Sequence, residues 1–233
     1  IGYIQKENLK FDTSICSKTL YNYIHLGLFL NVDARNIKKY RKKKTEEKRS
    51  VALHNLKSKM ITDRDDSVSD REEIGHWEMD TVVSGRGDKT CLLVLSERKT
   101  RYELIRKIKS KSQKDVIAEI DKLEIQLGDD FKNIFKSITM DNGVEFLDFE
   151  SIEKSALGSP APRTETYYCH PFSSWERGTN ENINKMIRKW IPKGAFIGDY
   201  TEGQIKKIEK WLNSYPRKIF DYHSAEEMFV LSI

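Results

Sequence analysis

Apolar residues recur at helical spacing in the part of the chain that follows residue 180. They stand three, four and seven residues apart: Ile183, Met186, Ile187 and Trp190. This spacing predicts an amphipathic helix, which Pro192 and Gly194 end. The opposite stripe carries one carboxylate followed by two cations: Glu181, Lys185 and Arg188. Such a stripe is typical of a solvated helix face, but it also has the composition of a metal ligand beside phosphate-binding cations.

Strand patterns alternate with further helices upstream and downstream of this segment. Alternating or continuous apolar runs, separated by turn signals, predict strands over residues 77–84, 90–95, 101–108, 134–141 and 164–169. Helical spacing predicts helices over residues 112–127, 146–157 and 201–214. The order is three antiparallel strands followed by alternating helices and strands, which indicates an α/β fold.

A short helix and a basic run precede the strands. Ser17 and Gly27 are suited to begin and end a helix over residues 17–26. The polar residues near its start are of the kind that a recognition helix presents to a DNA major groove, and an ordinary surface helix fits the pattern equally well. Residues 38–44 form a basic run with one aromatic residue. Runs of this kind bind phosphates or remain as solvated tails.

The charge is distributed unevenly along the chain. Residues 1–50 contain 12 Lys and Arg against 5 Asp and Glu, whereas the whole chain carries a net charge of +5. The positive charge is therefore a property of the N-terminal part, and the rest is slightly acidic in balance. Residues 45–74 are rich in charged residues and Ser, which indicates a linker. This arrangement suggests separate modules for binding a polyanion and for chemistry.

The composition excludes several other classes of protein. The longest apolar runs, such as residues 91–95, fall far short of the roughly 20 residues that a membrane helix needs. The three cysteines, Cys16, Cys91 and Cys169, are scattered and argue against a disulfide framework or a zinc site. We therefore expect a soluble, cytoplasmic protein. Because the chain begins at Ile1 rather than at Met, we also expect that an upstream segment is missing.

Three carboxylates occupy positions that suit a metal site. Asp80 lies within a β-branched strand, where Asp is uncommon unless a partner or a cation compensates its charge. Asp141 ends a predicted strand directly before an Asn-Gly turn, and the carboxyl ends of strands are where open α/β sheets present ligands. Glu181 comes from the late helix. Their convergence would offer the oxygen ligands that Mg²⁺ prefers, in outline a two-metal site.

Several strings in the sequence resemble those of one protein family. They are Gly75-His76-Trp77-Glu78 with Asp80-Thr81, Asp141-Asn142-Gly143 with Glu145-Phe146, and the stretch from His170-Pro171 through Ser174-Trp175-Glu176-Arg177-Gly178 to Asn180-Glu181-Asn182. With these strings, about residues 61–229 resemble the insertion-sequence 30 family of bacterial transposases, which is similar in fold to retroviral integrases. A weaker likeness at Thr19-Leu20-Tyr21 resembles the end of the family's helix-turn-helix region.

The resemblance implies an architecture. It is an α/β, ribonuclease-H-like fold, the integrase catalytic core, with a mixed five-stranded sheet and flanking helices. A small helical, basic N-terminal segment would precede it. The implied domains are a partial, helix-turn-helix-like DNA-binding segment over residues 1–50, a linker over 51–74 and a DDE catalytic domain over 75–233.

The resemblance also implies which residues carry the chemistry. The three catalytic, metal-ligating acids of the family fall on Asp80, Asp141 and Glu181. Glu176 is a rival for the third role, but Gly178 suggests that Glu176 precedes the helix. The integrase pattern Gly-x-x-Glu-x-x-Asn-Lys also selects Glu181. The expected cofactor is a pair of Mg²⁺ ions, for which Mn²⁺ is expected to substitute.

Four residues near the third acid are candidates for contact with DNA: Arg177, Asn180, Lys185 and Arg188. For each of them, a role in helix solubility alone is the competing interpretation. The expected partner is double-stranded DNA, both the terminal repeats of a transposon and the target. A homodimer or larger assembly on DNA is expected from the family, in the bacterial cytoplasm and associated with the nucleoid.

The implied activity is Mg²⁺-dependent cleavage at transposon ends, followed by attack of the freed 3′-hydroxyl on target DNA. Two alternatives stay open. The chain could be a truncated, non-catalytic DNA-binding regulator derived from a transposase, or a ribonuclease-H-like nuclease without strand transfer.

Overall fold

The structure is a computed structural model that describes residues 2–29, 32, 58–170, 173, 176 and 178–233. The chain divides into two compact units. The N-terminal unit comprises residues 1–50 with 216–223, and the sheet unit comprises residues 51–215 with 224–233. Residues 58–74 belong to the sheet unit, in which the buried Arg64 donates a hydrogen bond to Thr139 Oγ1 (3.0 Å). The domain boundaries at residues 50 and 74 stay predictions.

The N-terminal unit contains two α-helices within its described residues, α1 (Gly2–Lys6) and α2 (Ser17–His25), and the short η7 (Lys218–Phe220). The helix expected over residues 17–26 is confirmed, and Gly27 follows it with φ of +71°. Ser17 was expected to cap this helix, but the N-cap is Cys16, without a side-chain hydrogen bond to the first turn. The basic run 38–44 lies outside the described residues.

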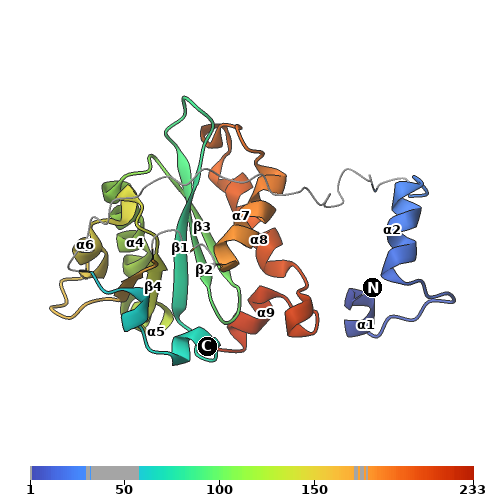
Figure 1. Cartoon of the computed structure of the whole chain (residues 1–233), viewed down its shortest axis with the longest axis horizontal. Helices are drawn as coiled ribbons and strands as arrows, with labels where there is room; N and C mark the ends of the chain where they lie inside the picture. The colour runs from blue at the N-terminus through green and yellow to red at the C-terminus, as the bar shows by residue number, and fades with distance from the viewer. Residues whose placement is uncertain (1, 30–31, 33–57, 171–172, 174–175, 177) are drawn as a thin grey trace. The chain divides into compact units, whose positions relative to one another are not determined.

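The sheet unit is built on a mixed five-stranded sheet (Figure 1). Its strands are β1 (His76–Val83), β2 (Cys91–Glu97), β3 (Glu103–Ile108), β4 (Ser137–Met140) and β5 (Glu165–Tyr168). They lie in the order β3-β2-β1-β4-β5. The first three strands pair antiparallel, and β4 pairs parallel with both β1 and β5. The predicted mixed sheet is thereby confirmed.

Helices cover both faces of this sheet (Figure 1). One face carries α4 (Gln113–Leu127), α5 (Phe131–Ile134) and α6 (Phe149–Glu153), and the other carries α7 (Gly178–Trp190) and α8 (Glu202–Ser214). The remaining elements are α9 (Ala225–Val230) and short turns of helix: η2 (Ile61–Asp63), α3 (Ser67–Asp70), η3 (Gly128–Asp130), η4 (Val144–Phe146) and η6 (Ile197–Asp199). None of the helices in the described part of the chain combines the length and apolar character that a membrane span requires. The expected fold, an α/β sheet with flanking helices of the ribonuclease-H-like kind, is confirmed.

The alternation of side chains along β1 separates two hydrophobic cores. Trp77 and Met79 point into the core on the α4 face, whereas Val82 points into the core that α7 and α8 cover. The long helices predicted from apolar spacing are α4, α7 and α8, and each buries its apolar stripe in one of these cores. Such burial is what stabilises a helix in a folded protein.

Two predicted elements are about half as long as expected or less. The strand expected over residues 134–141 begins only at Ser137, because Phe131 and the residues after it form α5. There Phe135 stacks on both Phe131 (4.7 Å between ring centroids) and Trp77 (4.6 Å). The helix expected over residues 146–157 is reduced to α6, whose N-cap Asp148 accepts a hydrogen bond from the Ser151 amide. Both differences arise from packing and capping contacts, which apolar periodicity does not report.

The outer edge of the sheet is closed by side chains of α8. Glu209 accepts hydrogen bonds from the Ile105 amide (2.7 Å) and from Arg106 Nη1 (2.9 Å). Asn213 accepts from the Glu103 amide (2.8 Å) and donates to the Glu103 carbonyl (2.9 Å). An open edge strand is a template for pairing with another chain, so these contacts protect β3.

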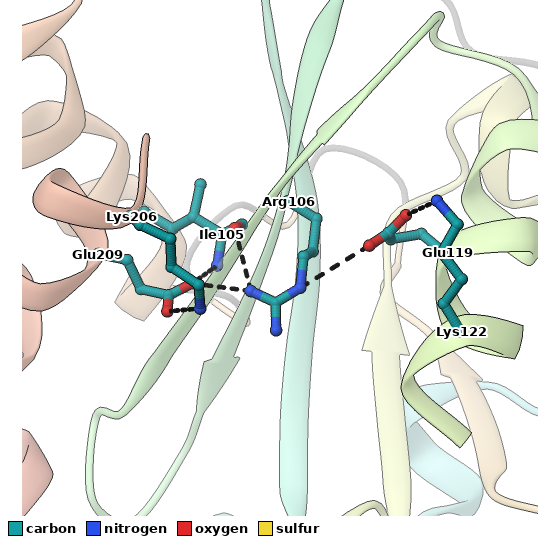
Figure 2. A network of polar contacts seen from close by, with 6 residues as sticks. All are labelled: Ile105, Arg106, Glu119, Lys122, Lys206 and Glu209. Carbon is teal, nitrogen blue, oxygen red and sulfur yellow. Dashed lines mark hydrogen bonds and ion pairs between the residues drawn. The ribbon is translucent and has the colours of Figure 1, made fainter. Parts of the chain in front are cut away.

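Arg106 connects both helical layers across this edge. Figure 2 shows its guanidinium between Glu209 of α8 and Glu119 of α4, with its Nε 3.7 Å from the Glu119 carboxylate. Lys206 and Lys122 extend the network on its two sides (2.6 and 2.8 Å to the respective carboxylates). Through Arg106, the edge strand β3 therefore connects the helices on the two faces of the sheet.

We predict that Glu209→Ala lowers the free energy of unfolding by about 2–4 kcal/mol, because the buried Ile105 amide loses its acceptor and Arg106 loses the nearer of its two carboxylates. Urea denaturation followed by tryptophan fluorescence measures this change. Lys206→Ala is the matched control: its side chain is 61% exposed and pairs with the same carboxylate. It should cost no more than about 1 kcal/mol. An equal loss in both variants would contradict the role assigned to Glu209.

Candidate active site

The parallel pairing of β1 with β4 relates the positions of two of the expected acids. His76, Trp77 and Glu78 pair with Ser137, Ile138 and Thr139. β4 ends at Met140, so Asp141 is the first residue after the strand. If the register continued by two residues, Asp80 would lie level with Asp141, at the spacing of about 4.8 Å between neighbouring strands.

Asp80 faces helix α7. Asn184 of α7 donates a hydrogen bond through Nδ2 to Asp80 Oδ2 (2.7 Å). The helix is held in this place by buried isoleucines on its inner stripe and just beyond its end: Ile183, Ile187 and Ile191. Sequence reasoning used Asn184 only as part of a motif, and its contact with the carboxylate depends on the tertiary fold.

Asp141 is held by the turn that follows it. The Gly143 amide donates to Asp141 Oδ1 (2.9 Å), and Asn142 Nδ2 donates to the Cys169 carbonyl just after β5 (2.9 Å). A Cβ atom at Gly143 would lie 2.8 Å from Asp141 Oδ1 and 2.5 Å from Glu145 Oε2. Gly143 has a φ of −66°, so the close approach of two carboxylates, rather than backbone conformation, favours glycine here.

Glu145 is a carboxylate that sequence reasoning did not select for the site. It is buried, with 2% of its surface exposed, and its Oε1 accepts from the Thr81 hydroxyl (2.7 Å) and lies 3.1 Å from Lys111 Nζ. Its other oxygen is buried and has no hydrogen-bond partner in the described part of the chain. Glu145 belongs to the family string that begins at Asp141, and this position in the sequence was the one indication that it could lie near the site.

The structure describes the side chain of Glu176 but not that of Glu181, the two candidates for the third acid. Glu181 lies on α7, three residues before Asn184, but its side chain lies outside the described part of the chain. The Glu176 carboxylate accepts from the His170 amide (2.9 Å) and lies 2.8 Å from His170 Nδ1. Glu176 precedes α7, which begins at Gly178, as predicted from that glycine. Its carboxylate is engaged in closing the loop before that helix.

The four DNA-contact candidates also differ from one another. Arg177 lies outside the described residues. Asn180 is 2% exposed, and Lys185 is exposed on α7. Arg188 donates through Nη2 to the Val83 carbonyl at the end of β1 (2.6 Å), and burial lowers the pKa of its guanidinium. Arg188 therefore ties α7 to β1.

Some of the buried polar atoms without a partner in the described part of the chain lie on α7 and in the loop after β4. Within the described residues they include both amide atoms of Asn180, the amide oxygen of Asn184 and Oε2 of Glu145. Buried polar groups are normally satisfied, so such atoms indicate a place for water, an ion or a ligand. Carboxylate and amide oxygens suit a hard divalent cation. No three His, Cys, Asp or Glu side chains among those that the structure describes are grouped closely enough to hold a metal ion.

A buried ion pair lies on β1 two residues before Asp80. Arg98 Nη1 donates to Glu78 Oε1 (2.6 Å), and both side chains are at most 5% exposed. Burial and the nearby charge of Arg98 also lower the pKa of Arg64. The buried charges of Glu78 and Arg98 neutralise each other. Removal of either partner would leave the other as an uncompensated buried charge.

The sequence of this chain is similar to those of several known proteins. A protein from Streptococcus salivarius, named as a transposase for the insertion-like sequence element IS1161, is 35% identical over 221 residues, which cover 93% of this chain and 59% of that protein. The transposase InsI for insertion sequence element IS30C of Escherichia coli is 29% identical over 72% of this chain and 41% of its own length. A protein of Spiroplasma virus SpV1-R8A2 B, named as an integrase, is 30% identical over 99% of this chain and 67% of its own length.

The chain belongs to the IS30 family of transposases. No family model matches it. This IS30-family chain spans less than two thirds of the length of the first two relatives, 59% and 41%.

In this IS30-family chain, we predict that Thr81→Val lowers the free energy of unfolding by about 1–3 kcal/mol, because the buried Glu145 carboxylate loses the hydroxyl that donates to it. Thr81→Ser keeps the hydroxyl and should stay within about 1 kcal/mol of the parent protein. Urea titrations of the three proteins under identical conditions give the comparison. If Val and Ser at this position were equally costly, the hydrogen bond would not be the cause.

Proposed function

We propose that this chain carries the catalytic core of a DNA transposase, which cleaves DNA at transposon ends and joins the freed 3′-hydroxyl to target DNA. Asp80, Asp141 and Glu181 are its acidic triad. The observation that supports the proposal is the parallel β1–β4 register, which, if continued, would bring Asp141 level with Asp80, the carboxylate that Asn184 of α7 contacts. Membership of a family whose named relatives are transposases supports it.

The residues of this chain would prepare the site before any substrate binds. Asn184 orients the Asp80 carboxylate, and the Gly143 amide orients that of Asp141. Groups held in this way lose little freedom when the reacting phosphate arrives, which is the basis of catalysis by positioning. Glu181, as part of α7, would bring the third carboxylate from the other side.

The triad would hold two Mg²⁺ ions, with Mn²⁺ as a substitute. When bound, these ions would lower the pKa of the attacking water or hydroxyl and stabilise the leaving oxygen. The chemistry of the donors supports this cofactor. Three carboxylates are hard oxygen ligands, and so are the buried oxygens of Asn180, Asn184 and Glu145 that have no partner among the described residues; these oxygens could also accept from metal-bound water.

The substrate of this site is double-stranded DNA. Lys185 is exposed one turn beyond Glu181 on α7, where an ammonium group would contact a phosphate entering the triad. The other proposed contacts with DNA are made by Arg177, Asn180 and Arg188. Arg188 is held at the end of β1 by its hydrogen bond to the Val83 carbonyl. Pairing of two DNA ends calls for at least two copies of the chain, so the active assembly is a homodimer or larger.

Substitution of each acid by its amide should abolish Mg²⁺-dependent strand transfer. For Asp80→Asn, Asp141→Asn and Glu181→Gln we expect a loss of at least about 100-fold, because each amide removes a charge that holds the ions. A gel assay with labelled transposon-end DNA measures cleavage and joining separately, and DNA binding should stay within about twofold. Cleavage without joining in the parent chain would favour a ribonuclease-H-like nuclease instead.

Glu176→Gln is the matched control for the third acid, since it lies five residues before Glu181 and makes the same chemical change. Its carboxylate is engaged with His170, so we expect most of the strand-transfer activity to remain. Loss of activity in Glu176→Gln with retention in Glu181→Gln would move the third role to Glu176.

Gly143→Ala should lower strand transfer about 10- to 100-fold with little change in DNA affinity, because the new methyl group displaces Asp141 or Glu145. The initial rate of joining under Mg²⁺ measures the effect. Gly203→Ala on α8 is its control: its nearest neighbour would be Thr201 Oγ1 at 3.9 Å, so the activity should not change. Equal rates in the two variants would show that the carboxylates beside Gly143 tolerate displacement.

A further inference from the structure

Three aromatic side chains form a continuous row on α7, on α8 and at the end of α8. The rings of Trp190 and Trp211 meet edge to face with centroids 5.4 Å apart, and Trp211 lies 5.5 Å from Tyr215. Trp190 is 47% exposed and Tyr215 is 45% exposed, whereas Trp211 packs its inner side on the core. Core packing therefore explains the position of Trp211 but not the exposure of the other two rings.

Exposed lysines lie on the same two helices as this row. Lys189 Nζ lies 5.9 Å from the centroid of the Trp211 ring, and Lys207 and Lys210 are exposed on the same helix as Trp211. Among the side chains described on α7 and α8, the one exposed carboxylate is that of Glu202, at the start of α8. The other described carboxylate, that of Glu209, is buried in the network of Figure 2. We call the six residues Lys189, Trp190, Lys207, Lys210, Trp211 and Tyr215 the aromatic–lysine surface.

The chemistry of this surface selects its partner. The exposed lysines Lys189, Lys207 and Lys210 give this surface positive charge, which complements a polyanion. An isologous contact between two copies would set the same patch against itself and bring lysines against lysines, which disfavours a dimer through this face. Rings that alternate with cations are the composition of a nucleic-acid platform, on which bases stack while ammonium groups neutralise phosphates.

We propose that the aromatic–lysine surface binds an unpaired DNA strand. The rings can stack only on bases that are not already stacked in a duplex, so the exposed Trp190 and Tyr215 favour a single strand over a double helix. Such a strand is a segment of the DNA substrate that is unpaired when the chain acts on it. The inference rests on the proposed function for the identity of the partner, but it concerns a surface separate from the acidic triad.

Photo-crosslinking tests the proposal with the full chain. The probe is a single-stranded 5-iododeoxyuridine oligonucleotide of about 12 nucleotides, irradiated with the protein in the presence of excess unlabelled duplex of the same length and sequence. The duplex occupies sites that bind DNA through charge alone. We expect cross-links, mapped by mass spectrometry, on Trp190, Trp211 or Tyr215. Their absence, or equal competition by the duplex, would overturn the proposal.

Variants of the surface give the quantitative test. Trp190→Ala should weaken single-strand binding about 5- to 100-fold, the effect of losing one stacked base, whereas Trp190→Phe keeps a ring and should stay close to the parent affinity. Lys207→Gln and Lys210→Gln should each reduce the slope of log affinity against log salt by about 0.7. Lys114→Gln, an exposed lysine of α4, is the control and should leave the slope unchanged. Unaltered binding in Trp190→Ala would overturn the proposal.

Two further measurements distinguish strand binding by this surface from catalysis at the triad and from self-association of the chain. Asp80→Asn should cross-link as the parent chain does, so failure of the proposed catalysis would appear in the strand-transfer assay and leave the cross-links in place. Sedimentation of the parent chain and Trp190→Ala should give the same mass. A smaller mass for Trp190→Ala would mean that the surface joins two copies of the chain, which would overturn the proposal.

Discussion

The parallel pairing of β1 with β4 is the constraint on which the rest of the site depends. A slip of one residue would turn Asp141 to the opposite face of the sheet, because side chains alternate along a strand. Trp77 anchors the start of this pair: it is fully buried, stacks on Phe135 and donates through Nε1 to the Ile134 carbonyl (2.6 Å). These contacts join β1 to the segment that leads into β4 and so favour the observed register.

Different faces of helix α7 make different contacts: with the core, with Asp80 and with solvent. Its isoleucines are buried against the sheet, Asn184 reaches Asp80, and Trp190 with Lys189 is exposed to solvent. The helix that completes the proposed triad is thus also part of the surface proposed to hold an unpaired strand. Arg188 at the end of β1 and the core hold α7 in position, so the proposed triad and the proposed strand-binding surface would share one helix.

Sequence reasoning succeeded where structure follows from local periodicity, and it failed where contacts between distant segments decide. The strands of the meander and the helices α4, α7 and α8 were predicted, since each buries a stripe that is visible in the sequence. The start of β4 was misplaced because Phe135 packs on Trp77 across the fold. Glu145 was not selected, since its burial beside Thr81 depends on a contact across 64 positions of the chain.

The sequence by itself determined the class of fold, the identity of the candidate acids and the family strings that contain them. The tertiary structure alone decided the pairing of β1 with β4, the hydrogen bonds from Asn184 to Asp80 and from the Gly143 amide to Asp141, and the closure of the β3 edge by α8. The physical reason is range. Periodicity, caps and turns act over a few residues and are present in the sequence, whereas strand register and side-chain contacts between remote segments exist only once the two cores have packed.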